Sequence, residues 1–223
     1  MRQWSGISEG IAGWIHATAQ TNPAEMERHS AFIRARLLGA LSIAVLAPPY
    51  LALRGAPALW ETLVFLLALA PLASVALLSR TGHLLAAHAL CAVGCIFVGL
   101  TIAFGLGGLS GAALIWLALA PMQAIFSRSA ALVASAAAGA LSALAFIICG
   151  VAADFLVAHA PDALGLNAFY AALGLICAAT SAFGASAAEA NGERSREIGD
   201  ARFASLAGAL GDPLLRHDSN GLV

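Results

Sequence analysis

The residues best suited to chemistry are one histidine and two cysteines within a single apolar stretch. His88, Cys91 and Cys95 are spaced so that a helix would place all three on one face. Imidazole and thiolate groups are good ligands for zinc, copper or haem iron. One helix supplies only part of such a site, and the remaining ligands would have to come from His83, Cys149 or Cys177.

The same residues have a simpler interpretation. Small cysteines fill packed interiors, and a buried histidine needs only a polar partner. The sequence contains no glycine-rich phosphate loop, Ser-His-Asp arrangement or His-Glu-x-x-His motif. Glu61 and Glu189 lie near the ends of their apolar runs. We therefore expect no catalytic residue, no cofactor and no metal site in this chain, with the His88 group kept as the candidate for metal binding.

The composition places these residues in a membrane. Of 223 residues, 61% are hydrophobic and 10% are charged, whereas a soluble domain is about one quarter charged. So few charges leave no basic surface for nucleic acid. Six apolar runs approach the roughly 20 residues that a helix needs to cross the hydrocarbon. The predicted spans are about Leu37–Leu53, Ala58–Leu78, Leu84–Phe104, Leu109–Phe126, Ala130–Ala153 and Asn167–Ala188.

A repeated five-residue motif suggests that these spans form three hairpins. The sequence Leu-Ala-Leu-Ala-Pro occurs at Leu67–Pro71 and again at Leu117–Pro121, each time in a run that ends in Ser-Arg. The third hairpin keeps the length pattern without the phrase. Proline removes a backbone hydrogen bond inside a helix, so Pro71 and Pro121 are possible hinges, although a fixed kink is the commoner outcome.

The arginines predict the orientation, since the chain contains no lysine. An even number of spans puts both termini on one side of the membrane. That side would carry most of the arginines near the spans, against Arg54 alone on the other side. We therefore expect both termini in the cytoplasm. The arginines on the cytoplasmic side would be Arg28, Arg34, Arg36, Arg80, Arg128, Arg194 and Arg196.

The segment before the first span carries two helix signals. Residues 1–20 have an apolar stripe that predicts an amphipathic helix, lying on the membrane surface or on a cytoplasmic partner. Asn22 and Pro23 then favour the start of a helix that continues into the first span, with Pro48-Pro49 ending or bending it. The stripe consists of Trp4, Ile7, Ile11, Trp14 and Ile15.

After the sixth span the composition becomes charged. Residues 190–202 indicate a polar helix that leaves the membrane, followed by a short helix up to residue 210. Leu214–His217 is typical of a strand, and Asn220-Gly221 of a tight hairpin turn. A hairpin with half a return strand is unstable alone, so we expect the chain to be the front part of a longer protein.

From Arg202 onward, this tail resembles the opening of a PAS domain. A multi-span bundle, a polar helix and a PAS domain is the order in bacterial membrane sensor histidine kinases. The lead Glu27–Leu37 looks like that of the DivJ-type cell-division kinases of alphaproteobacteria. The resemblance implies an inner-membrane homodimer that acts on a response regulator, with ATP and Mg needed only by a kinase core absent here. His217 lacks the family's His-Glu/Asp-x-Arg-Thr-Pro context, so the phosphorylated histidine is not assigned to it.

Together these observations predict an all-α membrane protein. Six transmembrane helices form three hairpins and are followed by a signalling helix and the start of a PAS (α+β) domain. The expected function is signal input to a sensor histidine kinase. A small transporter or channel subunit, and the front end of a cyclic-dinucleotide signalling enzyme, stay open as alternatives. The expected divisions are 1–36, 37–189, 190–202 and 203–223.

Overall fold

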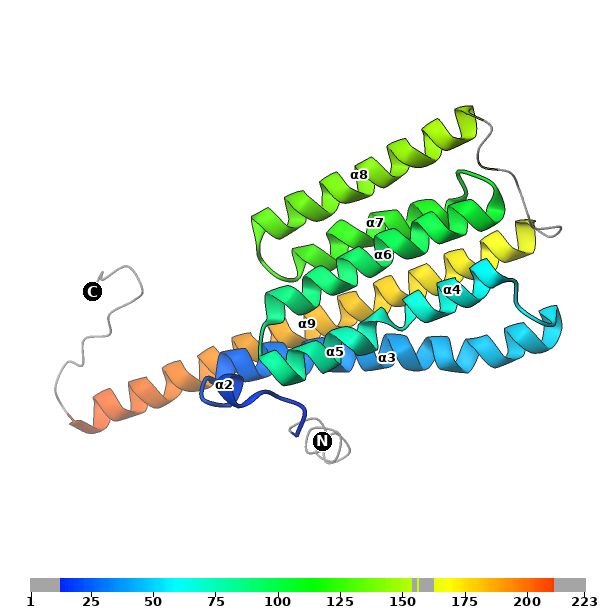
Figure 1. The fold of residues 1–223 in the computed structure, drawn as a ribbon. Coiled ribbons are helices and arrows are strands. Elements are labelled where there is room, and N and C mark those ends of the chain that lie inside the picture. Colours follow the sequence, from blue (N-terminus) through cyan, green and yellow to red (C-terminus); the bar gives the residue numbers. More distant parts are fainter. Residues whose placement is uncertain (1–12, 154–155, 157–162, 211–223) are drawn as a thin grey trace.

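The computed structural model describes residues 13–153, 156 and 163–210, and this part of the chain is helical, without strands. The predicted all-α class is confirmed for these residues. Helices α6 and α7 lie in the middle of the bundle, with α8 on one side of them and α3, α4, α5 and α9 on the other (Figure 1). The elements are α2 (Ala17–Gln20), α3 (Pro23–Arg54), α4 (Leu59–Ala68), α5 (Ala70–Thr81), α6 (Leu84–Leu106), α7 (Gly111–Ile125), α8 (Ala130–Ala152) and α9 (Ala163–Leu210).

Five helical segments are long and apolar enough to cross a membrane, by length and composition. They support the prediction of a membrane protein. Among them, the segment in α8 is the least buried inside the bundle. The five are Pro23–Arg54, Leu59–Thr81, Leu84–Leu106, Ala130–Ala152 and Leu164–Ser186.

The expected fourth span forms the shorter helix α7, which has 15 residues. At about 1.5 Å per residue it is about 22 Å long, against about 30 Å of hydrocarbon. Its start is delayed because Gly107 and Gly108 adopt positive φ after α6 and Ser110 then caps α7. Six full-length spans are therefore not shown by the described part of the chain.

Helix α3 begins where the sequence predicts. The Asn22 side chain accepts a hydrogen bond from the Ala24 N–H at 3.0 Å, and Pro23 lies in the first turn. Pro48 and Pro49 do not end this helix, since it continues to Arg54. The residues ahead of it differ from the expected helix over 1–20: residues 13–15 form a turn, and α2 begins only at Ala17. Residues 1–12 lie outside the described part.

The two repeated prolines occupy different positions. The expected second span is divided at Leu69, so that Pro71 lies in the first turn of α5, where the missing N–H has no helical partner to lose. Pro121 instead lies inside α7, which runs through it without interruption. The Leu-Ala-Leu-Ala-Pro motif therefore spans a helix boundary at residues 67–71 but lies within a helix at residues 117–121.

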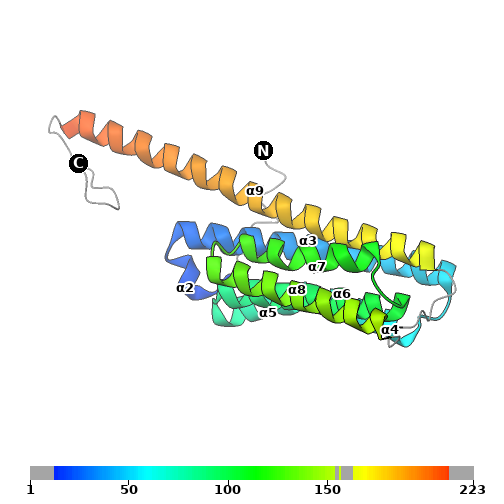
Figure 2. The ribbon, with the colours of Figure 1, turned by 90° about the horizontal axis from the view of Figure 1, so that it is seen from above.

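Helix α9 unites segments that the sequence analysis treats as separate. The sixth span, the polar connecting segment and the short helix after it form one helix of 48 residues. Figure 2 shows α9 extending well past the end of the bundle, on the side where α2 lies. The predicted strand and hairpin turn over 214–221 lie outside the described residues.

Candidate functional site

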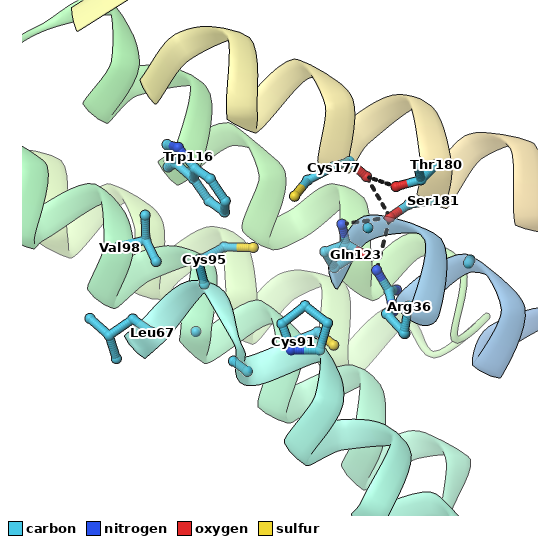
Figure 3. A pocket seen from close by; sticks show the side chains of 16 residues that line it. Arg36, Leu67, Cys91, Cys95, Val98, Trp116, Gln123, Cys177, Thr180 and Ser181 are labelled. Atoms are coloured by element: carbon cyan, nitrogen blue, oxygen red, sulfur yellow. Dashed lines mark hydrogen bonds between the residues drawn. The ribbon is translucent and has the colours of Figure 1, made fainter. Parts of the chain in front are cut away.

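Three buried polar side chains meet where α3, α7 and α9 pack together. The Arg36 Nη1 donates a hydrogen bond to the Ser181 Oγ at 2.8 Å, and the Gln123 Nε2 donates to the same oxygen at 3.1 Å. Ser181 in turn donates to the Cys177 carbonyl at 2.7 Å (Figure 3). The exposed fractions of Arg36, Gln123 and Ser181 are 5%, 2% and 4%. We call these three residues the polar triad.

Small residues bring α3 and α9 close enough for this contact. A Cβ atom built on Gly184 would lie 2.5 Å from the Ala35 Cβ, and one built on Gly39 would lie 3.4 Å from the Thr180 Oγ1. Such residues let neighbouring helices approach closely. The Arg36 guanidinium also lies 4.8 Å from the centre of the Phe32 ring, which is within cation–π range.

The polar triad leaves two buried atoms without partners. The Arg36 Nε and the Gln123 Oε1 make no hydrogen bond. Two ion pairs occur among the described residues, Arg28–Glu25 and Arg54–Glu61, and neither includes Arg36. A buried arginine is costly when no carboxylate neutralises it, and an ionisable group inside a membrane bundle often marks a functional site.

A small cavity adjoins the polar triad (Figure 3). Its volume is about 30 Å³, comparable to about two water-sized spheres. Thiols and apolar groups form the rest of its wall. They include Leu67, Cys91, Cys95, Val98, Trp116 and Cys177.

The residues proposed as metal ligands are engaged in other contacts. The His88 Nδ1 lies 3.0 Å from the Gln123 carbonyl oxygen, and its ring meets the Phe32 ring edge-on. Cys91 donates to the Ser74 Oγ at 3.1 Å. Within the described residues, no three His, Cys, Asp or Glu side chains are placed to hold a metal ion. This arrangement matches the simpler interpretation of His88.

The remaining candidates lie in three places. Cys95 and Cys177 line the same cavity as Cys91, so the structure brings three of the four cysteines together. Cys149 is exposed on α8, and His83 precedes α6 in the α5–α6 turn. The sequence analysis uses Arg36 only to predict the orientation in the membrane and does not identify the polar triad. Polar side chains at Gln123 and Ser181, inside otherwise apolar runs, were the available signal.

A second polar cluster lies at the opposite end of α3. The Glu61 carboxylate, 1% exposed, accepts hydrogen bonds at 2.6 Å from the Tyr50 hydroxyl and from the Ala58 N–H. The Arg54 Nε lies 3.8 Å from the same carboxylate. Tyr50 also stacks on Phe169 of α9, with ring centres 4.0 Å apart. These contacts join the C-terminal end of α3 to the start of α4 and to α9.

Replacing His88 by leucine is expected to destabilise the bundle by about 1–3 kcal/mol, because the buried Gln123 carbonyl loses its donor. A carbonyl only accepts, so the Nδ1 of His88 carries the hydrogen in this contact. The measurement is thermal unfolding of the purified protein in detergent. The control is His83→Leu outside the helices, and equal effects of the two substitutions would contradict the assignment.

Comparison with protein-family models, curated proteins and solved structures found no match. The polar triad and the long helix α9 are the observations from which a function can be argued.

Proposed function

We propose that this chain is the membrane input portion of a two-component sensor histidine kinase. The observation that carries the proposal is the continuity of α9, which joins the buried Ser181 to Leu210 in a single helix. In this proposal the bundle receives a signal and α9 relays it to cytoplasmic domains.

The dimensions of α9 suit a relay. A helix of 48 residues is about 72 Å long, more than twice the thickness of about 30 Å of hydrocarbon. The apolar portion ends at Ser186, and the helix extends roughly 35 Å beyond it. A continuous helix transmits a rotation or a shift from one end to the other, because its backbone hydrogen bonds resist bending.

The contacts of α9 with other helices of the bundle provide a route by which their movement could reach it. Ser181 is held by side chains from α3 and α7, so a change in either helix acts on α9 directly. The proposed hinges are Pro71, which follows the helix break at Leu69, and Pro121, which lies inside α7 two residues before Gln123.

The finer features of the proposal come from the sequence. The short helix α7 completes six spans, both termini face the cytoplasm of a bacterial inner membrane, and two copies form the working unit. A PAS domain that begins near Arg202 and a kinase core then act on a response regulator. The resemblance of the tail to a PAS opening supports this order.

The first test is the reading frame beyond codon 223. A complete PAS domain followed by a His-Glu/Asp-x-Arg-Thr-Pro motif would establish the kinase. A cyclic-dinucleotide enzyme signature would keep the relay and change the output. A stop codon directly after Val223 would contradict the proposal and favour a transporter or channel subunit.

The second test rotates the C-terminal part of α9 about the helix axis, relative to the membrane bundle, in the full gene product. One alanine inserted after Ala201 rotates the following residues by about 100°, whereas seven inserted residues return them to within about 20°. We expect the single insertion to change autophosphorylation by about tenfold or more. The seven-residue insertion is expected to restore it, as measured by phosphate incorporation in isolated membranes. Equal activity of all three proteins would contradict a relay through α9.

A further inference from the structure

We infer that the cavity beside the polar triad binds a small monovalent anion, of which chloride is the simplest example. The inference concerns the bundle alone and does not depend on the output domain. It starts from the charge of Arg36, which the described residues do not neutralise.

Arg36 cannot lose its positive charge by deprotonation. A guanidinium group stays protonated in proteins, so burial cannot neutralise it as it can a lysine. Its two observed partners, the Phe32 ring and the Ser181 oxygen, supply only partial negative charge. Among the described side chains, a positive charge therefore remains unneutralised between helices whose long segments are apolar. An anion next to the guanidinium cancels this charge.

The unpaired atoms at the cavity define how the anion would be held. The Arg36 Nε–H is a free, charged donor, suited to an anion. The Gln123 Oε1 is a free acceptor and would repel an anion in direct contact. One water molecule resolves this, because it donates one hydrogen to the Gln123 oxygen and the other to the anion. The cavity volume of about 30 Å³ is comparable to about two water-sized spheres, so the proposed contents are one single-atom anion and one water.

The walls of the cavity select the class of anion. The rings, methyl groups and thiols of Trp116, Val98 and Cys95 offer little to a strongly hydrated ion. Sulfate, phosphate and organic acids are larger than a halide and are strongly hydrated, so these walls disfavour them. A halide is small and keeps its water loosely, so chloride or bromide fits both conditions.

Thermal unfolding of the full chain in detergent tests the inference. Cys149 is exposed and is replaced by serine in all proteins compared, whereas Cys91, Cys95 and Cys177 are buried in the folded state. A thiol-reactive fluorescent dye then reports unfolding. We expect the Tm to rise by about 3 °C, saturably, when sodium chloride replaces sodium gluconate at equal ionic strength. Equal Tm values in the two salts would mean that the cavity holds water only and would overturn the inference.

Two substitutions assign the effect to Arg36. In Arg36→Met the chloride dependence should disappear, and such a replacement of a buried charge by an apolar side chain of similar size is often tolerated. The matched control is Arg34→Met, on the same helix, where Arg34 donates to Ser30 at 3.0 Å and does not line the cavity. Chloride dependence that persists in Arg36→Met, or disappears in Arg34→Met, would overturn the assignment.

Gln123→Glu gives an independent readout if Arg36→Met does not fold. The new carboxylate would lie beside Arg36, because both side chains contact the Ser181 Oγ. It supplies a built-in counter-charge and competes with chloride. We expect the Tm of this variant to be the same in chloride and gluconate. A variant that keeps the full chloride dependence would overturn the inference.

Discussion

Replacing Gly184 by leucine is expected to push α9 away from α3 and to lower the free energy of unfolding by about 3 kcal/mol. Even a Cβ atom at this position would lie 2.5 Å from the Ala35 Cβ and 3.3 Å from the Ala31 carbonyl oxygen. A side chain cannot be accommodated there unless one helix moves. Because Ser181 lies one turn earlier on α9, the same movement would break its bond to Arg36.

Thermal unfolding in detergent measures this effect. Ala182→Leu is the matched control, since Ala182 lies on the same helix and is exposed. Gly184→Ala should fall between the control and Gly184→Leu, because alanine adds only the first of the clashing atoms. If Gly184→Leu and Ala182→Leu unfold at the same temperature, the close α3–α9 contact is wrong.

Replacing Glu61 by alanine is expected to cost about 3–5 kcal/mol. The substitution leaves the Tyr50 hydroxyl and the Ala58 N–H without their acceptor and Arg54 without its ion-pair partner. The Ala58 N–H precedes the first turn of α4, so the start of that helix loses its cap at the same time.

The measurement is again the thermal unfolding of the purified chain, together with proteolysis in the α3–α4 connection. Thr62→Val serves as the control, because Thr62 is exposed and its hydroxyl donates to the carbonyl of Ala58, the residue that caps α4. Glu61→Gln should recover part of the stability, since its amide oxygen can still accept one of the two hydrogen bonds. An effect of Glu61→Ala no larger than that of Thr62→Val would show that the buried cluster contributes little.

The helices were largely predictable because their signals are local. Apolar composition located all the long segments, and Asn22 with Pro23 marked the start of α3. The boundaries that differed also have local causes. Leu69 ends α4 ahead of a proline that suits a first turn, and Ser110 caps α7 late. A change to charged composition near residue 190 does not end a helix, because no proline or strong cap occurs there.

The polar triad was beyond prediction from the sequence for a different reason. Arg36 and Ser181 are separated by 145 positions, and helical periodicity describes only the face of one helix at a time. Whether a polar residue in an apolar run meets another depends on how the helices pack. In the same way, the spacing of His88, Cys91 and Cys95 correctly placed them on one helix, but their partners come from Gln123 and Ser74 on other helices.

The continuity of α9 also decides how its protruding part is stabilised. Starting a helix in water is unfavourable, because several residues must be fixed before the first hydrogen bond forms, whereas extending an existing helix is nearly free of that cost. In α9 the first turns are formed against α3 and α7, within the bundle. The bundle therefore serves as the nucleus for the residues that follow Ser186, and their helicity depends on an unbroken backbone connection to the membrane segment.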